Sequence, residues 1–287
     1  MALIVVTSAH AGEGKTGVAA AIARHYAYQG VAVRVARLAS EDPAAGPRDA
    51  AYYAALDFVP GTTSATLAAA QVSNPPAGEL LVIEADASDL ASLPPAQVVL
   101  VTRDAVVSIP DGVSPAAIVQ VGTSARPAPG SGGTEIRLPD DRTLAGFSVS
   151  EIQAMLRAET LVQGENGDPT CDYLVVAPFG SDAGQPYFRR FPSKAVVGRF
   201  DRTDMHLAAI RADADVLVLT GGRYPSDYVF DAARATGIPV LLSATDTENT
   251  VIALEGIWDR TRFQGDRKLD RMTGLLEATN LFESLEV

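Results

Sequence analysis

Short apolar runs alternate with helix-like segments through the first half of the chain. Each run has the length of a strand, and polar or glycine-containing breaks follow it, which is typical of strands buried on both faces. The predicted strands are 3–7, 31–38, 80–83, 98–101 and 118–121, and the predicted helices are 15–29, 48–56 and 63–70. Gly30 is expected to end the first helix. This alternation predicts a parallel sheet covered by helices.

The pattern starts again after a Ser-, Pro- and Gly-rich stretch at 123–133, which predicts a surface loop. An amphipathic helix is expected at 149–157, with Ser148 as its N-cap. Further strands are predicted at 173–177, 195–197, 216–219 and 239–243, and further helices at 204–212, 228–235, 247–257 and 268–285. Gly237 is expected to close the helix at 228–235. The second half therefore predicts another, smaller α/β domain.

Composition restricts the class of protein. Of the 287 residues, 47% are hydrophobic and 20% charged, which supports a packed core and excludes global disorder. The first residues are typical of a buried strand and not of a signal peptide, and no apolar run is long enough to cross a bilayer. A single cysteine, Cys171, allows no internal disulfide, and with only three histidines beside it the chain is not expected to build a zinc site from nitrogen and sulfur ligands. The net charge of −12 argues against nucleic-acid partners. The single cysteine fits a reducing cytoplasm, and with no membrane-spanning run we expect a cytoplasmic protein without membrane partners.

The strongest chemical signal is the segment Ser-Ala-His-Ala-Gly-Glu-Gly-Lys-Thr at 8–16, which follows a strand and opens a helix. That is the context of a phosphate-binding P-loop, in which glycines turn backbone N–H groups toward a phosphate at a helix N-terminus. The expected nucleotide-binding residues are Gly12, Glu13, Gly14, Lys15 and Thr16. Ala9 stands where the common pattern has its first glycine. The alternative interpretation is a glycine-rich turn with an incidental lysine.

A nucleotide bound there is expected to be ATP or ADP with Mg²⁺. The Thr16 hydroxyl is the first expected metal ligand. The strand at 80–83 ends in acids, of which Glu84 is the preferred ligand and Asp86 the second choice. Asp49 is a further candidate. The alternatives are a solvated strand end for the first two acids and a simple helix-terminal acid for Asp49.

With the motif at Val6–Ser8 and Gly12–Thr16, the chain resembles the dethiobiotin synthetase-like P-loop family. Its second half resembles a DRTGG domain, on the segments 197–203, 219–222, 238–242 and 245–247. The pair is similar to the N-terminal half of long bacterial phosphate acetyltransferases. The resemblance implies an α/β fold with a P-loop NTPase-type domain at 1–146 and a smaller DRTGG-type regulatory domain with a helical tail at 147–287. The stretch 138–144 resembles the junction of such domains, so the boundary is placed near Gly146.

The resemblance also shows two departures from the ligase family. The ligases are expected to carry a second active-site lysine at the end of the second strand, where this chain has Arg37. An arginine does not readily deprotonate to act as a nucleophile. The glycine-rich turn after the glutamate is replaced by residues 85–88. Both departures argue against dethiobiotin synthesis and leave nucleotide binding or slow hydrolysis.

In the second domain, polar residues gather at predicted strand ends, where open α/β sheets bind ligands. The candidate ligand-site residues are Asp201, Arg202, Gly221, Gly222 and Asp246. The alternative is that the glycines make tight turns and Asp201 caps a helix. The leading hypothesis is a nucleotide-binding regulatory or sensory protein with a small ligand or protein partner at the second domain. An ATP-dependent carboxylate ligase is the second hypothesis, and a scaffold that binds no nucleotide and forms homo-oligomers is the third.

Overall fold

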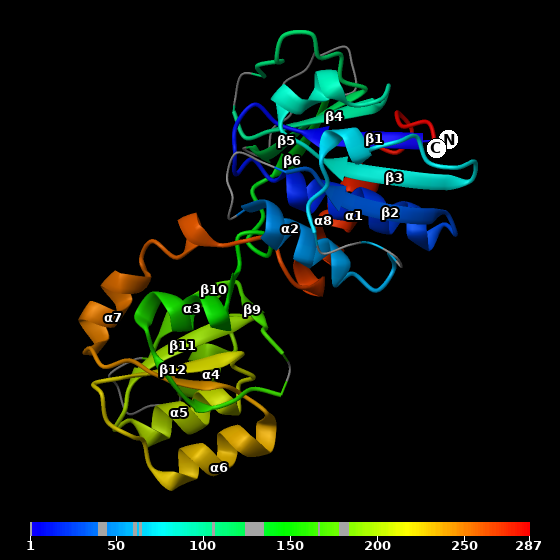
Figure 1. Cartoon of the computed structure of the whole chain (residues 1–287). Coiled ribbons are helices and arrows are strands. Elements are labelled where there is room, and N and C mark those ends of the chain that lie inside the picture. Colours follow the sequence, from blue (N-terminus) through cyan, green and yellow to red (C-terminus); the bar gives the residue numbers. More distant parts are fainter. Residues whose placement is uncertain are drawn as a thin grey trace. The chain divides into compact units, whose positions relative to one another are not determined.

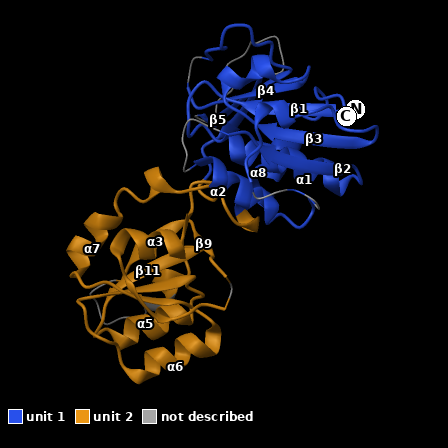
Figure 2. Ribbon diagram, in the orientation of Figure 1, with its two compact units in different colours: residues 1–141, 268–287 blue, residues 142–267 orange. Residues whose placement is uncertain are grey.

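The structure is a computed structural model that describes residues 2–39, 45–59, 62, 65–104, 107–123, 135–165, 167–177 and 184–287. Contacts divide the chain into two compact units (Figures 1 and 2). Unit 1 consists of 1–141 and 268–287, and unit 2 of 142–267. This division differs from the expected one at 146 in two ways: it falls a few residues earlier, and it assigns the tail 268–287 to unit 1 and not to the second domain.

Unit 1 contains a six-stranded sheet whose strand order is β2-β3-β1-β4-β5-β6, and every pair in it is parallel. Its strands are β1 (Ala2–Thr7), β2 (Ala32–Arg37), β3 (Glu79–Glu84), β4 (Gln97–Thr102), β5 (Ala117–Thr123) and β6 (Glu135–Pro139). All residues of β1 are buried because it lies in the interior of the sheet and has neighbours on both sides. The predicted parallel α/β fold is confirmed.

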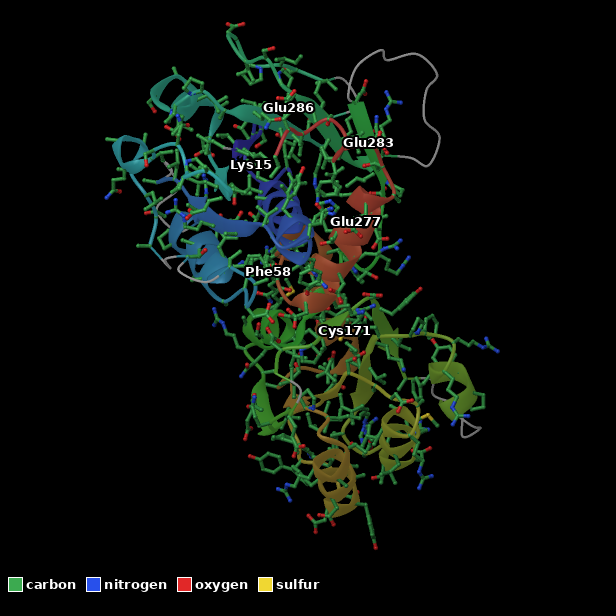
Figure 3. The ribbon with its side chains drawn as sticks, turned by 90° about the vertical axis from the view of Figure 1, so that its right-hand side faces the viewer. Lys15, Phe58, Cys171, Glu277, Glu283 and Glu286 are labelled. Carbon is green, nitrogen blue, oxygen red and sulfur yellow. The ribbon has the colours of Figure 1, made fainter. Side chains whose placement is uncertain are left out.

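The helices of unit 1 include one from the C-terminal tail. They are α1 (Lys15–Tyr28), α2 (Ala45–Ala54), α8 (Asp266–Glu277) and the short 3₁₀ helices η1 (Ala69–Gln71) and η2 (Ala87–Ser92). Helix α8 lies beside α1 (Figure 3). His25 of α1 is 2.9 Å from Glu277 and stacks on Phe282 with 3.6 Å between ring centroids. The expected tail helix is therefore shorter than 268–285 and packs on the first domain.

Two predictions for unit 1 were wrong or incomplete. The helix expected at 63–70 does not form at 65–68, where Leu67 instead pairs with the end of β2 through its N–H to Arg37 and its carbonyl to Ala39. These backbone bonds keep the segment extended. Strand β6 was not predicted, and most of the loop expected at 123–133 lies outside the described residues.

Unit 2 contains a second sheet, with the order β10-β11-β12-β13-β8, in which only the edge strand β8 is antiparallel. Its strands, with the small pair β7 and β9, are β7 (Phe147–Ser148), β8 (Glu159–Val162), β9 (Thr170–Cys171), β10 (Tyr173–Val176), β11 (Lys194–Arg199), β12 (Val216–Thr220) and β13 (Val240–Leu242). Its helices are α3 (Val149–Leu156), α4 (Gly184–Phe188), α5 (Thr203–Ile210), α6 (Asp227–Thr236), α7 (Thr247–Leu254) and the 3₁₀ helix η3 (Trp258–Arg260).

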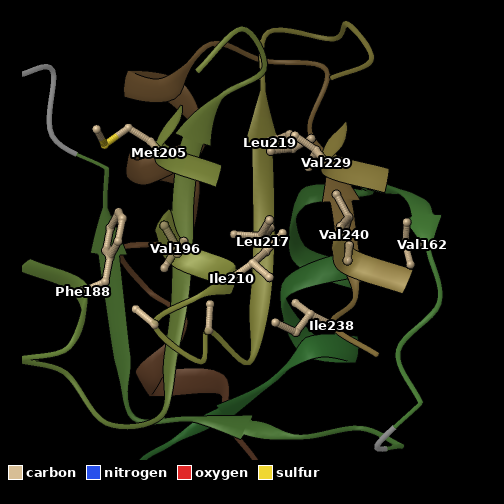
Figure 4. Close-up of a cluster of buried hydrophobic side chains, with 14 of the residues drawn as sticks. Val162, Phe188, Val196, Met205, Ile210, Leu217, Leu219, Val229, Ile238 and Val240 are labelled. Atoms are coloured by element: carbon tan, nitrogen blue, oxygen red, sulfur yellow. The ribbon is translucent and has the colours of Figure 1, made fainter. Parts of the chain in front are cut away.

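Alternate residues of the unit 2 strands enter two cores, one on each face of the sheet. On β12, Leu217 and Leu219 pack in the core with α5 and α6, which Figure 4 shows. Val216 and Val218 of the same strand face the other core, which α3 and α7 cover. Burial on both faces explains why the predicted strands read as continuous apolar runs.

Local end signals of unit 2 were predicted correctly. Ser148 caps α3 by accepting the N–H of Glu151 at 3.2 Å, and the Glu151 carboxylate accepts the Ser148 N–H at 2.8 Å. Gly237 ends α6 in the left-handed conformation, with φ at 68°. The short elements β7, β8, β9 and α4 were not predicted. Within the described ranges, no helix is long and apolar enough to span a membrane.

Candidate functional site

The loop between β1 and α1 has the backbone geometry that its glycines predict. Gly12 and Gly14 have φ values of 81° and 101°, a region that other residues rarely adopt. Gly14 is the N-cap of α1 and has no side chain with which to cap the helix. The first N–H groups of α1 have no intrahelical acceptor, so this helix start is suited to an anion.

The side chain of Glu13 holds the loop together and does not face outward. It is only 5% exposed, and its carboxylate accepts the His10 N–H at 3.1 Å and the Thr102 hydroxyl at 3.2 Å. The Ser8 hydroxyl donates to the His10 carbonyl at 2.5 Å. Glu13 was one of the five expected nucleotide-binding residues. Its side chain instead has a structural role, because it connects the loop to the end of β4.

Lys15 and Thr16 both contact acids at the end of β3. The Lys15 ammonium lies 2.7 Å from Asp86, and the Thr16 hydroxyl lies 3.3 Å from Glu84. Lys15 is at the start of α1 (Figure 3), and β1 and β3 are hydrogen-bonded neighbours, so the glycine-containing loop at 8–16 and the acidic strand end meet at one edge of the sheet. The structure thus brings the expected phosphate-binding and metal-binding residues together.

Glu84 is buried and surrounded by donors. Tyr53 of α2 donates its hydroxyl to one carboxylate oxygen at 2.5 Å. Arg37, the register partner of Glu84 on β2, places its Nε 3.8 Å from the other oxygen and donates to the Glu84 carbonyl at 3.2 Å. The side chains of Arg37 and Glu84 are 3% and 2% exposed. A carboxylate so deeply buried is tolerated because it is paired and hydrogen-bonded.

Arg37 also reaches the two other acids of the cluster. Its Nη2 lies 3.3 Å from Asp86 and its Nε 3.7 Å from Asp49. Burial raises the pKa of Asp49 to about 6, and repulsion from Glu84 adds to this shift, while Arg37 opposes it. Burial lowers the pKa of Arg37, but attraction to Glu84 and Asp86 outweighs that effect and leaves it above its ordinary value. The guanidinium is therefore a permanent positive charge.

The residues expected to hold Mg²⁺ contact other groups of the protein in this structure. Magnesium requires oxygen ligands at about 2.0–2.1 Å in octahedral geometry. The oxygens of Glu84 already accept from Thr16 and Tyr53, and Arg37 stands within ion-pair distance of both Glu84 and Asp49. No group of three or more His, Cys, Asp or Glu side chains within the described ranges is arranged to hold a metal ion.

The five candidate residues of unit 2 lie at the carboxyl ends of its parallel strands, but local bonds engage them. Asp201 pairs with Arg199 at 3.0 Å, and Arg202 with Asp204 at 2.9 Å. The N-cap of α5 is Arg202, so the alternative in which Asp201 caps a helix was wrong.

The remaining three residues build turns. The N–H groups of Gly221 and Gly222 donate to the carbonyls of Thr245 and Ser243 at 2.7 and 3.0 Å, and both glycines have positive φ. Asp246 caps α7 by accepting the Asn249 N–H at 2.8 Å. This part of the edge has the geometry of tight turns and a helix cap.

Residues 151–257 match the family model of the DRTGG domain. Unit 2 contains a DRTGG domain. A similar solved structure is the crystal structure of the CBS and DRTGG domains of the regulatory region of Clostridium perfringens pyrophosphatase, complexed with its activator diadenosine tetraphosphate. It is 20% identical, with a TM-score of 0.35, and the similarity covers 44% of this chain and 54% of that one. This chain thus spans about half the length of that relative.

The DRTGG segments named from the sequence lie on the central strands of this domain. Segment 197–203 includes the end of β11, segment 219–222 includes the end of β12, and segment 238–242 contains the whole of β13. In unit 1, sequence reasoning missed Tyr53 and the pairing role of Arg37. A signal for Tyr53 was present, because it follows Asp49 by one helical turn and so lies on the same helix face. The contacts of Arg37 had no local signal.

Proposed function

We propose that this protein is a nucleotide-binding regulatory protein, in which unit 1 binds the phosphates of ATP or ADP and the DRTGG domain senses a small ligand or a protein partner. The observation that carries the proposal is the loop at 8–16, where Gly12 and Gly14 have positive φ and Lys15 begins α1. Backbone N–H groups and a lysine at such a helix start are suited to phosphate.

Two further observations support a regulatory role. One is the sequence resemblance of roughly residues 2–260 to the N-terminal half of long phosphate acetyltransferases, which implies a P-loop domain followed by a DRTGG domain. The DRTGG domain also occurs in the regulatory region of the Clostridium perfringens pyrophosphatase. Arg37 at the end of β2 argues against the ligase hypothesis, because its buried and paired guanidinium cannot act as a nucleophile.

The test is nucleotide binding measured by calorimetry on the whole chain. Lys15→Ala is expected to weaken ATP or ADP binding at least about tenfold, because it removes the cation nearest the helix start and costs about 1.4 kcal/mol or more. The control is Arg34→Ala, which removes an exposed cation of β2 that pairs only loosely with Glu79, at 3.6 Å. Equal affinity of the wild type and Lys15→Ala would show that the loop does not bind the phosphates.

A further inference from the structure

We propose that the Arg37 guanidinium takes the place of a divalent cation at this P-loop, so that the site excludes Mg²⁺ and binds nucleotide without it. The nucleotide part of this statement rests on the proposed function. The metal part rests on the geometry of the cluster formed by Lys15, Arg37, Asp49, Glu84 and Asp86, which is called the strand-end cluster below.

The sheet holds the Arg37 guanidinium close to both Asp49 and Glu84. Its Nε lies 3.7 Å from Asp49 and 3.8 Å from Glu84, so the guanidinium stands between the two carboxylates that a metal would have to bridge. The position is imposed by the sheet, because Arg37 is the register partner of Glu84 on the neighbouring strand. The side chain is 3% exposed and also donates to the Glu84 carbonyl, so it cannot swing aside into solvent without breaking buried bonds.

The net charge of the strand-end cluster also works against a divalent cation. The strand-end cluster holds three carboxylates and two cations, so with every group ionised its net charge is −3 + 2 = −1. A divalent ion would add two positive charges next to a fixed guanidinium, at separations where the repulsion is large in a buried site. Without Arg37 the balance would be −3 + 1 = −2, which attracts a divalent cation.

Hydrogen bonds already engage both carboxylate oxygens of Glu84. One of its carboxylate oxygens accepts from Tyr53 at 2.5 Å, and the other accepts from Thr16 at 3.3 Å. A metal bound to Glu84 would compete with these donors for the carboxylate and would lie within ion-pair distance of Arg37. The arginine thus lowers the negative charge of the acidic strand end, and so reduces its repulsion of the phosphates of a nucleotide held by Lys15 and the start of α1.

The metal is tested first without nucleotide, by titrating Mn²⁺ into the whole chain and following the free-ion signal by electron paramagnetic resonance. The wild type is expected to bind no Mn²⁺ at this site, whereas Arg37→Gln is expected to gain a Mn²⁺ site that is lost again in Arg37→Gln with Glu84→Gln. Arg37→Lys keeps the charge and is expected to exclude Mn²⁺. Arg34→Gln, on the same strand but exposed, is the matched control and is expected to behave like the wild type.

The nucleotide is then tested by measuring ATP affinity with Mg²⁺ and with EDTA. The wild type is expected to bind ATP about equally well in both, and Arg37→Gln to bind at least about tenfold more tightly with Mg²⁺. A wild type that binds Mn²⁺ through Glu84, or that needs Mg²⁺ for a tenfold gain, overturns the inference. If no form binds ATP but Arg37→Gln gains the Mn²⁺ site, the proposed function fails while the role of Arg37 against metals stands.

Should Arg37→Gln not fold, the wild type and Arg37→Lys still decide the question. Both carry a cation at position 37, and both are expected to exclude Mn²⁺ and to bind ATP in EDTA. Binding of Mn²⁺ by the wild type that Glu84→Gln removes would overturn the inference without any variant of Arg37.

Discussion

At the scale of single residues, buried ionisable groups are tolerated in two different ways. In the strand-end cluster, charges are kept because each meets an opposite charge or a hydrogen-bond donor, as Glu84 does with Tyr53 and Arg37. In the DRTGG domain, His206 of α5 is only 1% exposed. Burial lowers its pKa from 6.5 to about 4, against the opposing effects of the Arg199 backbone and Asp204, so it is neutral near neutral pH.

This shift predicts how stability depends on pH. Because the folded state of the domain disfavours the protonated imidazole, the stability that comes from neutral His206 is complete above its ordinary pKa of 6.5 and is lost as the pH falls toward 4. Between about pH 7 and about pH 5, the wild type is expected to lose about 2 kcal/mol more than His206→Gln. The measurement is the free energy of unfolding of the DRTGG domain, obtained from urea titrations at several pH values. His10→Gln, at an exposed position of unit 1, is the control, and a His206→Gln profile parallel to the wild type would contradict the prediction.

At the scale of elements, strands and helices with strong end signals were predicted well, and short edge elements were not. The buried runs of β1, β3 and β12 and the capping box of α3 carry their information in neighbouring residues. Strand β8, by contrast, exists because its residues pair with β13 at the sheet edge, and such pairing over a long sequence distance leaves no periodic signature in a four-residue strand.

Replacing Gly14, the N-cap of α1, and Gly274, within α8, by alanine is expected to change stability in opposite directions. Gly14 has φ at 101°, and an added Cβ would meet only Val121, at 3.9 Å. Gly14→Ala is therefore expected to cost about 1–2 kcal/mol through backbone strain and to weaken nucleotide binding. Gly274 in α8 has ordinary helical geometry and open space around it, so Gly274→Ala is expected to stabilise unit 1 by about 0.5–1 kcal/mol.

The measurement is the unfolding free energy of each variant, together with its ATP affinity. Gly274→Ala serves as the matched control, since it adds the same methyl group without the strained backbone. A Gly14→Ala protein as stable as the wild type, with unchanged affinity, would mean that the loop does not need the left-handed conformation.

At the scale of the whole molecule, the tail belongs to the core of unit 1. Residues of 268–287 that are buried there include Leu269, Met272, Leu276, Leu281 and Leu285. The end of the tail also pairs with β4, because Gln97 accepts the Glu286 N–H at 2.8 Å. Removing even one buried leucine side chain typically costs about 2–5 kcal/mol.

A chain ending at Arg267 is therefore expected to lose the cooperative melting transition of unit 1, because the sum of these losses is at least as large as the stability of most domains, about 5–15 kcal/mol. Calorimetry of the full chain, of 1–267 and of the fragment 142–267 identifies the transitions. The fragment is expected to melt cooperatively, and so is the same segment within 1–267. An unchanged unit 1 transition in 1–267 would contradict the role assigned to the tail.

The sequence by itself determined the features that depend on neighbouring residues. Buried strands appear as apolar runs, helix ends as Ser148, Gly30 and Gly237, and the left-handed turns before α1 as the glycines that precede Lys15, because each of these requirements is local in the chain. The expected phosphate loop and acidic strand end then met at one sheet edge, as the parallel βαβ order requires.

Only the tertiary structure decided which charges face one another and where the tail packs. Arg37 lies far along the chain from Glu84, and it fills the space between Glu84 and Asp49 because β2 and β3 pair in a register that no local pattern reveals. The amphipathic face of α8 shows that it must be buried, but not against which unit. Hydrophobic burial is non-directional, so the partner of such a face is determined by the rest of the fold.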